Sequence, residues 1–550
     1  MKKFFTIIVV LLMVGGCAWA YYNLDYLKEL APNDERISTT EFFDVSGDEV
    51  ALMYNYTLQE TKGVYKNSNI YLPLDWVRAC LNDDFYWDES ANVLIYALPD
   101  RLQYSDLETK GSDGSPFLIM NNGKVCISLP LIKSYTDIVA HEFVSDEAKR
   151  VFINNIYGEY ACAAAGKKTL LRTGDSIKQR GIVDIEAGEK LRILKDGDWV
   201  RVYSEKGYTG YLNSSDLSQR TTETLSSSGV KMPERVDHKL DGKVLLVWHQ
   251  ITNQSANAAF EGTFAKADGV NVVSPTWFFV SDESGNCDSL VSTDYITAAH
   301  ARGMQVWALV DNYTYQDLNT TKLLKSMDAR KKLIAFLVDT CLENGIDGIN
   351  VDFEQLTEAD SDAFAQFIKE LSVSCENNAL VLSVDNPNTA NYNLLYRRDV
   401  QARFCDYVIN MGYDEHWDGS DAGPVASHPF VVEGLELALN EVPKEKLING
   451  VPFYTRIWTV SGGTTTSQAV GFDIAKEWAS TCEADPVWKA DLQCYYYVKG
   501  SERCWMENSE TLRKKVELCN DLDLAGIACW KMGLESSDVW EILSPTPVEE

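Results

Sequence analysis

Apolar and polar side chains alternate along residues 347–354, which read Asp-Gly-Ile-Asn-Val-Asp-Phe-Glu. Because successive residues of a β-strand point to opposite faces, Ile349, Val351 and Phe353 share an apolar face, whereas Asn350, Asp352 and Glu354 share the other. Burying an unpaired polar group costs about 2–7 kcal/mol. A strand with such a polar face is therefore expected where its polar side chains have a function. Two carboxylates two residues apart at the end of a strand can place a proton-donating acid beside an electrostatic partner. A calcium site or a solvated strand end is the alternative.

This strand belongs to a longer pattern, because the chain after residue 240 alternates apolar strands with amphipathic helices. Eight strand–helix units of this kind predict a (β/α)₈ barrel, the TIM-barrel form of an α/β fold. One helix is well defined: Asp328 is its expected N-cap and Asn344-Gly345 its expected end. The eight expected strands are Val244–Trp248, Val270–Ser274, Gln305–Val310, Gly348–Phe353, Leu380–Val384, Tyr407–Met411, Leu447–Pro452 and Gly526–Trp530.

The first 240 residues show different patterns. Residues 38–160 combine short strands and short helices, and a strand followed by a helix occurs twice, at 69–77 and at 124–132. Residues 168–217 hold five closely spaced strands separated by glycine-containing turns, which predicts a small β-barrel. The expected segments are a targeting segment at 1–20, a small α+β domain at 21–165, a small β-barrel at 166–220, a linker at 221–240 and the (β/α)₈ barrel at 241–545.

Lys2 and Lys3 precede an uncharged apolar run that extends to about Trp19. Three outcomes fit this segment: lipidation of Cys17 after Val14-Gly15-Gly16, ordinary cleavage after Ala18-Trp19-Ala20, or an uncleaved anchor. All three predict an extracellular or cell-surface location, with contact to a membrane only through this segment. The other 12 cysteines lack metal spacing, and we expect them to be buried free thiols.

The net charge of −31 over 550 residues argues against a nucleic-acid partner. In (β/α)₈ barrels the reacting groups lie at the carboxyl ends of the strands. Here those positions hold carboxylates and aromatic rings, with no metal cluster, no phosphate loop and no Ser or Cys nucleophile near a His. This inventory predicts an uncharged, hydroxyl-rich ligand such as a glycan, with no cofactor and no metal. The strand-end residues are Trp248, Trp277, Asp311, Glu354, Asp385, Tyr413, Asp414, Tyr454, Arg456 and Trp530.

Three motifs together resemble glycoside hydrolase family 18, which contains chitinases and peptidoglycan N-acetylglucosaminidases. They are residues 347–354 on the fourth strand, Met411-Gly412-Tyr413-Asp414 on the sixth and Trp530 on the eighth. The resemblance implies that Glu354 is the general acid and that Asp352 and Tyr413 orient the N-acetyl group of the substrate, which itself attacks the anomeric carbon. The residues expected to bind substrate are Asn350, Met411, Asp414, Trp530, Trp248, Tyr454 and Arg456.

The two smaller segments also carry resemblances. Residues 21–165 resemble the N-terminal α+β domain of copper amine oxidases, and residues 166–220 resemble bacterial SH3-like domains. The first resemblance implies a spacer or a wall-binding module and no copper chemistry, because His141 is the only histidine of that segment. For the second, binding of wall peptides and a spacer without a ligand both remain open.

These observations predict an exported, monomeric enzyme that cleaves β-1,4 bonds at N-acetylglucosamine in peptidoglycan or in chitin-like glycans. A lectin-like glycan-binding protein on the same barrel is the alternative. One position departs from the family pattern, since many members have Asp where this chain has Asn350. An amide can hydrogen-bond Asp352 but cannot share a proton with it, so we expect the pKa of Asp352 to be lower than it would be beside a carboxylate.

Overall fold

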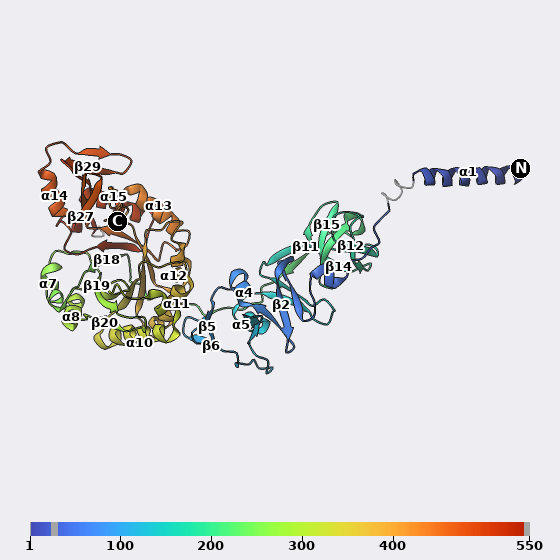
Figure 1. Ribbon diagram of the computed structural model, residues 1–550, viewed down its shortest axis with the longest axis horizontal. Helices are drawn as coiled ribbons and strands as arrows, with labels where there is room; N and C mark the ends of the chain where they lie inside the picture. Colours follow the sequence, from blue (N-terminus) through green and yellow to red (C-terminus); the bar gives the residue numbers. More distant parts are fainter. Residues whose placement is uncertain (1, 24–30, 544–550) are drawn as a thin grey trace, which may run out of the picture. The chain divides into compact units, whose positions relative to one another are not determined.

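The computed structural model describes residues 2–23 and 31–543, which fall into two units (Figure 1). Unit 1 comprises Met1–Phe85 and Ser105–Met232, and unit 2 comprises Tyr86–Tyr104 and Pro233–Glu550. The chain begins with helix α1 (Lys2–Tyr22), and residues 24–30 at the start of the expected α+β domain lie outside the described residues. Within the described ranges, no helix combines the length and the apolar character needed to cross a bilayer.

Unit 1 contains a seven-stranded sheet in the order β7-β8-β3-β2-β1-β10-β9. The two predicted strand–helix repeats are confirmed as β3 with α4 and β8 with α5, and the two strands pair antiparallel with Leu72 opposite Ile127. The elements of this part are α3 (Thr39–Phe43), β1 (Glu49–Tyr54), β2 (Thr57–Lys66), β3 (Asn69–Pro73), α4 (Leu74–Cys80), β7 (Leu118–Asn121), β8 (Lys124–Ser128), α5 (Leu129–Tyr135), β9 (Val139–Phe143) and β10 (Arg150–Asn154).

A second seven-stranded sheet of unit 1 has the order β13-β12-β16-β15-β14-β11-β17. The five expected strands of residues 168–217 are present, and two more, β11 and β17, extend the sheet beyond β14. The sheet therefore begins before residue 166, and the first residues of the expected linker form a paired strand instead. Its strands are β11 (Gly158–Ala164), β12 (Thr169–Arg172), β13 (Gly181–Ile185), β14 (Lys190–Lys195), β15 (Trp199–Ser204), β16 (Tyr208–Asn213) and β17 (Thr221–Leu225).

The two sheets of unit 1 share one hydrophobic core rather than forming two separate domains. Phe43 and Phe152 from the first part lie in the same buried cluster as Leu171 and Val202 from the second. A common core removes more apolar surface from water than two small ones would, which stabilises short sheets of this size.

Unit 2 is built on a closed barrel of parallel strands, and all eight predicted strands are confirmed. The barrel closes because β18 pairs with both β31 and β19, and the short β20 (Cys287–Ser289) adds antiparallel to β19. The barrel strands are β18 (Val244–His249), β19 (Val272–Val280), β21 (Gln305–Asp311), β22 (Gly348–Asp352), β23 (Val381–Pro387), β24 (Tyr407–Met411), β25 (Leu447–Pro452) and β31 (Gly526–Trp530).

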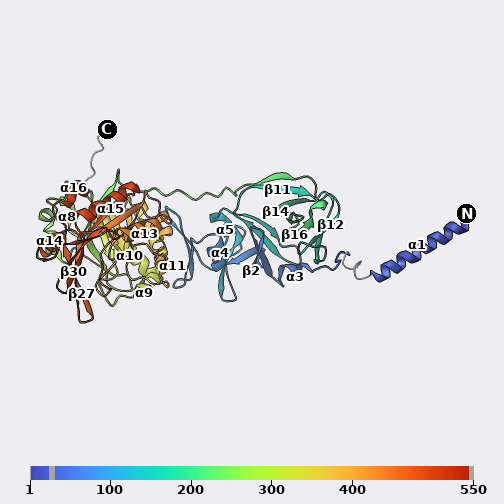
Figure 2. The ribbon, with the colours of Figure 1, turned by 90° about the horizontal axis from the view of Figure 1, so that it is seen from above.

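Helices surround these strands, as two views of the ribbon show (Figure 1 and Figure 2). The helix before β22 ends as predicted, with Gly345 in the left-handed conformation at its C-cap. Its start differs, because Ser326 and not Asp328 is the N-cap and accepts a hydrogen bond from the Ala329 amide. The longer helices are α8 (Thr293–Ala301), α10 (Met327–Asn344), α11 (Ser361–Asn377), α12 (Arg398–Phe404), α13 (His428–Ala438), α14 (Phe472–Ser480) and α15 (Ser509–Asp521).

Gly348 opens β22 because a side chain there has no room. A Cβ at this position would lie 2.7 Å from the carbonyl oxygen of Val381 and 2.9 Å from the ring of Trp307. Trp307 stacks on Tyr407 with ring centroids 5.3 Å apart, and both are buried. Gly348 thus leaves room for the Trp307 ring. The packing of Trp307 on Tyr407 in turn supports the strand that carries the polar residues of the motif.

Two further sheets belong to unit 2, and the sequence patterns predicted neither of them there. Between β25 and β31 the chain forms a five-stranded sheet in the order β27-β26-β30-β29-β28. The other is the three-stranded sheet β4-β5-β6, which lies in the expected α+β domain by sequence but in unit 2 by its packing. The strands are β4 (Phe85–Asp88), β5 (Val93–Ala97), β6 (Leu102–Ser105), β26 (Tyr454–Ser461), β27 (Thr464–Gly471), β28 (Val487–Lys489), β29 (Cys494–Lys499) and β30 (Glu502–Met506).

A buried ionic cluster attaches the three-stranded sheet to the barrel helices. Arg330 of α10 donates to Asp88 Oδ2 at 2.9 Å and to both carboxylate oxygens of Glu370 on α11, and all three side chains are at most 2% exposed. The Asp88 and Glu370 carboxylates accept hydrogen bonds from the Arg330 guanidinium and offset its positive charge, which would otherwise be costly to bury. All cysteines of the chain are free thiols, and most are buried.

Candidate active site

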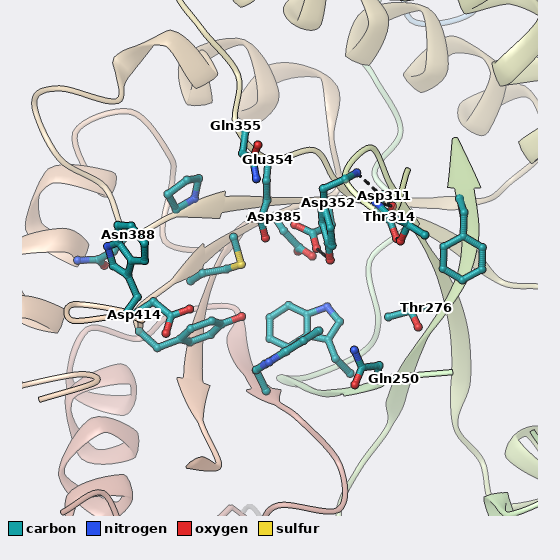
Figure 3. A pocket seen from close by; sticks show the side chains of 18 of the residues that line it. Gln250, Thr276, Asp311, Thr314, Asp352, Glu354, Gln355, Asp385, Asn388 and Asp414 are labelled. Atoms are coloured by element: carbon teal, nitrogen blue, oxygen red, sulfur yellow. Dashed lines mark hydrogen bonds between the residues drawn. The ribbon is translucent and has the colours of Figure 1, made fainter. Parts of the chain in front are cut away.

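The carboxyl ends of the barrel strands surround a cleft of about 940 Å³. Its lining contains seven carboxylates together with aromatic rings and uncharged polar groups (Figure 3). A cavity of this size with a few convergent polar groups is typical of a ligand site. The carboxylates are Asp288, Asp311, Asp352, Glu354, Asp385, Asp414 and Glu415.

Three neighbouring strands place carboxylates at one level of the barrel. Asp311 of β21 is in register with Asp352 of β22. On the other side Val351 is in register with Val384, so the next residues, Asp352 and Asp385, are neighbours on β22 and β23. In Figure 3 Asp352, Asp385 and Glu354 lie together. The barrel thus gathers acids that lie far apart in the sequence.

Asn350 lies one layer below these acids and is fully buried. Its Oδ1 accepts from Trp248 Nε1 at 2.9 Å and from Ser274 Oγ at 3.0 Å, and its Nδ2 donates to Ser383 Oγ at 3.0 Å and to Asp385 Oδ1 at 2.8 Å. The sequence-based expectation that this amide bonds Asp352 and touches substrate therefore needs correction. All four of its hydrogen bonds go to protein groups, and its carboxylate partner is Asp385.

Asp352 is 3% exposed and has one satisfied oxygen. Tyr313, in the loop after β21, donates its hydroxyl to Asp352 Oδ2 at 3.0 Å. The other oxygen, Oδ1, is buried and has no hydrogen-bond partner among the described residues. Burial raises the pKa of Asp352 well above its ordinary value, and the charges of Asp385 and Glu354 raise it further. This carboxyl therefore binds a proton much more readily than an exposed aspartate does.

Glu354 follows β22 and is held by its backbone. Asn312 Oδ1 accepts from the Glu354 amide at 2.8 Å, and Asn312 Nδ2 donates to the Glu354 carbonyl at 3.0 Å. The side chain is half-buried and projects into the cleft. Burial raises the pKa of Glu354, and the charges of Asp414 and Asp311 add to this effect. A glutamate in this state can keep its proton at higher pH than an ordinary one, as a general acid must.

Aromatic rings line the same cleft as these acids. Trp248 and Trp530 meet with ring centroids 5.8 Å apart, and Tyr413 meets Trp248 at 6.4 Å. Met411 and Asp414 also line the cleft, so five of the side chains that we expected to contact substrate line it: Trp248, Met411, Tyr413, Asp414 and Trp530. Rings of this kind suit the apolar faces of a sugar.

Tyr454 and Arg456, which we expected to bind substrate, do not line the cleft. The Tyr454 hydroxyl donates to Asp414 Oδ1 at 2.5 Å, and Arg456 Nη2 lies 4.0 Å from the same oxygen. The structure therefore places both residues behind Asp414, where they orient its carboxylate. Trp277, another strand-end residue, is buried and donates to Asn257 instead of facing the cleft.

Sequence analysis missed several groups of the site. Asn312 and Tyr313 follow the strand end Asp311 directly, but a loop residue has no periodicity that reveals which side chain it will reach. Asp311 itself is held by Thr314, whose amide and hydroxyl donate to it at 3.0 and 2.9 Å. At the rim of the cleft Trp417 and Tyr392 are 55% and 83% exposed, as surfaces for a long ligand would be. Asp347 is structural, since it accepts from the Val306 amide at 2.7 Å and pairs with His300.

A family model described as glycosyl hydrolases family 18 matches residues 256–535, which is half of the chain. The chain therefore belongs to glycosyl hydrolase family 18, and a glycosidase built on a (β/α)₈ barrel is the class of protein that its fold and cleft define. The match does not include residues 1–255, so the resemblances of the two smaller segments remain predictions.

Curated relatives cover the same part of the chain. An uncharacterized glycosylase of Bacillus subtilis, YvbX, is 24% identical over 48% of this chain and 81% of its own length. The cortical fragment-lytic enzyme of Bacillus subtilis is 26% identical over 44% of this chain and 59% of its own length. Among solved structures, the spore cortex-lytic enzyme SleL of Bacillus cereus superposes with a TM-score of 0.51 at 18% identity, over 57% of this chain and 76% of that one. The last similarity shows a shared fold.

Proposed function

We propose that this protein is an exported glycosidase that cleaves β-1,4 bonds next to N-acetylglucosamine by substrate-assisted, retaining catalysis. The observation that carries the proposal is the arrangement of Glu354 above Asp352. Glu354 is a half-buried acid with a raised pKa at the centre of an aromatic-lined cleft, and Asp352 is a buried carboxyl two residues before it. No separate nucleophile is needed when the sugar supplies its own acetamido oxygen.

In the first step Glu354 donates its proton to the glycosidic oxygen as the bond to the anomeric carbon breaks. The carbonyl oxygen of the N-acetyl group attacks that carbon, which closes a ring and places positive charge on the acetamido group. Asp352 accepts a hydrogen bond from the acetamido N–H and stabilises this charge, because a negative group in a dry site acts strongly on a nearby positive one. The Tyr413 hydroxyl holds the acetamido oxygen in line, and the Trp530 ring supports the sugar.

In the second step the Glu354 carboxylate takes a proton from a water molecule that attacks the anomeric carbon from the side the leaving group vacated. The ring opens, the acetamido group is restored, and Glu354 is protonated again for the next cycle. Two displacements at one carbon return its original configuration.

A wall glycan is the substrate that the relatives support best, since one is named a cortical fragment-lytic enzyme and another structure a spore cortex-lytic enzyme. Export is inferred from the apolar N-terminal segment with its two leading lysines. The alternative is a lectin on the same barrel. A lectin would not require a proton-donating acid in its cleft, so the presence of Glu354 favours the enzyme.

The test is the hydrolysis of a chromogenic N-acetylglucosamine oligomer by the wild type and by Glu354→Gln, which keeps size and removes the acid. We expect turnover by the wild type and a loss of at least about a thousandfold in the variant. Equal zero rates for both proteins, with oligomer binding retained, would favour the lectin. Mass analysis of products from purified muropeptides and from chitin oligomers then decides between the two substrates.

A further inference from the structure

Asp352 and Asp385 form a buried pair whose hydrogen bonds leave one oxygen of each carboxyl without a partner. Asp352 Oδ2 accepts from Tyr313, and Asp385 Oδ1 accepts from Asn350. Asp352 Oδ1 and Asp385 Oδ2 are buried, and neither has a partner among the described residues. The two side chains are 3% and 1% exposed and start from neighbouring strands, whose separation is about 4.8 Å. Two ionised carboxylates in this position would leave two unpaired charges out of water.

We propose that one proton is shared between Asp352 Oδ1 and Asp385 Oδ2, and that Asp385 is thereby the positioning residue of Asp352. The pair then carries a single negative charge, and each carboxyl has both oxygens engaged. The catalytic part of this proposal rests on the proposed function, whereas the shared proton itself is a property of the protein alone.

Asn350 determines which oxygen of Asp385 is available. An amide nitrogen only donates, so Asn350 Nδ2 occupies Asp385 Oδ1 and leaves Oδ2 for the proton. The amide is itself fixed, because Trp248 and Ser274 occupy its oxygen. The carboxylate that many relatives have at position 350 is thus absent here, and an acid on the adjacent strand takes the role of proton partner.

Among the residues that the structure describes, the groups found to act on the pair include no cation. The titratable groups that face it are Asp311 and Tyr313 from the end of β21, Glu354 from the end of β22, Tyr396 after β23, and Tyr413 from the end of β24. Each of these is an acid. Burial raises the pKa of Asp385 to about 8 and raises that of Asp352 as well, in agreement with a proton kept near neutral pH.

The shared proton gives Asp352 an adjustable charge. In the resting site the proton lies on Asp352 Oδ1 or between the two oxygens. When positive charge develops on the acetamido group, the proton moves to Asp385 Oδ2 and Asp352 gains a full negative charge. Only one O–H bond breaks and one forms, so the net charge of the pair does not change. The full negative charge on Asp352 therefore develops together with the positive charge on the acetamido group, and no proton is exchanged with solvent.

Asp311 offers a matched control for this proposal. It stands at the same level on the other strand next to β22, and its charge also acts on Asp352, although more weakly than that of Asp385. Both of its oxygens are occupied by Thr314. Asp311 is therefore also an aspartate on a strand next to Asp352, but both of its oxygens already accept hydrogen bonds.

The test measures the protonated-carboxyl stretching band by infrared spectroscopy in the full-length wild type and in Asp385→Asn, Asp352→Asn and Asp311→Asn at neutral pH. We expect Asp385→Asn and Asp352→Asn each to lose the same band, because an amide can donate to the remaining carboxylate and no proton is then needed. Asp311→Asn should keep it. The proposal is overturned if Asp385→Asn retains the band, which would mean that burial alone protonates Asp352, or if Asp311→Asn loses it too. Should Asp385→Asn fail to fold, Asp385→Ser replaces it, because it also removes the second carboxyl and leaves that of Asp352 in place.

Kinetics on an N-acetylglucosamine oligomer test the positioning role. Asp385→Asn should lower kcat by about tenfold while KM changes by less than about threefold, because the acetamido contact is retained and only its adjustable charge is lost. The alkaline limb of the pH–rate profile should also move to higher pH, since an amide cannot lose the shared proton. A changed KM with an unchanged pH profile would assign Asp385 a structural role instead. If the infrared bands of the wild type and the variants behave as expected but the wild type shows no hydrolysis, the proposed function is refuted and the shared proton stands.

Discussion

Asn312 holds Glu354 by both sides of its backbone: the Asn312 carboxamide accepts from the Glu354 amide at 2.8 Å and donates to its carbonyl at 3.0 Å. These two bonds fix the residue at the point where β22 ends and the next residue, Gln355, takes a positive φ of 57°. A general acid works only when its proton lies within reach of the leaving oxygen, so the position of this backbone matters as much as the acid itself.

Replacing Asn312 by Ala should therefore lower kcat by about tenfold to a hundredfold, because small displacements of reacting groups have large effects on rate. Asn312→Asp is the matched variant, since it keeps the acceptor for the Glu354 amide and loses the donor to the carbonyl; its kcat should lie between the other two. Steady-state kinetics measure this order, and thermal unfolding checks that the fold is intact. Equal kcat values for all three proteins would show that the two bonds do not position the acid.

Asp414 raises the pKa of Glu354 through its charge. Asp414→Asn removes that charge and should lower the pKa of Glu354, so the acid loses its proton at lower pH and the alkaline limb of kcat/KM moves to lower pH. Because Asp414 lines the cleft, the rate itself should also change, and only the position of the limb is diagnostic. Asp418→Asn, an exposed acid four residues later, should leave the limb in place. A limb unmoved in Asp414→Asn would mean that burial and the charge of Asp311, without Asp414, raise the pKa of Glu354.

Asp385 also links stability to pH. Its pKa is raised from 3.8 to about 8 in the folded protein. A carboxyl with a raised folded-state pKa contributes stability that is complete below its unfolded value, about pH 4, and is lost as the pH rises through about 8. The melting temperature of the wild type should therefore fall relative to that of Asp385→Asn over this range. Parallel curves for the two proteins would mean that the folded-state pKa of Asp385 is not raised.

Asn350→Asp changes the group that fixes Asp385. An aspartate at position 350 no longer donates to Asp385 Oδ1 and adds a third carboxyl to a buried layer, which should raise the pKa of Asp352 and move the acidic limb of the pH–rate profile to higher pH. Ser383→Ala is the control, since it removes another partner of Asn350 without adding a charge. An acidic limb unchanged in Asn350→Asp would remove the idea that the amide distinguishes this enzyme from its relatives.

The buried cluster of Arg330, Asp88 and Glu370 should stabilise unit 2 against unfolding. Asp88→Ala should lower the free energy of unfolding by about 3–5 kcal/mol, because it leaves Arg330 buried with an incomplete set of partners. Arg101→Ala removes an exposed ion pair with Asp100 near the same sheet and should cost less than about 1 kcal/mol. Denaturant unfolding measures both free energies. Equal losses would mean that the buried cluster contributes no more stability than an exposed ion pair.

The barrel and the central residues of its site could be predicted from local patterns. The residues whose hydrogen bonds hold those central residues in place could not. Apolar runs with β-branched residues identify strands such as 348–352 and 407–411 without tertiary information, and a closed parallel barrel then brings their carboxyl ends together. Glu354, Asp352 and Trp530 follow from that. The partner of Asn350 does not, because it depends on the register between β22 and β23, and the sequence contains no measure of register.

Loops and long-range packing account for the other differences. Asn312 and Tyr313 act through side chains that no period constrains. Ser326 and Asp328 are equally suitable caps, and only the path of the preceding chain decides between them. The helix cap was therefore misplaced by two residues. The packing of β4-β5-β6 on α10 and α11 depends on a charge cluster formed by residues 88, 330 and 370, which are too far apart in sequence for any local pattern to join.

That packing has a consequence for how the chain can be divided. The polypeptide passes from one unit to the other three times, near residues 85, 104 and 232. A protease that cuts within 226–240 severs one of the three crossings, and the two fragments remain associated for as long as the sheet of residues 86–104 stays on its helices. A gene fragment encoding only residues 233–550 would yield a barrel with Arg330 facing solvent where Asp88 belongs. The catalytic module of this protein is thus discontinuous in the sequence, and it begins well before its first barrel strand.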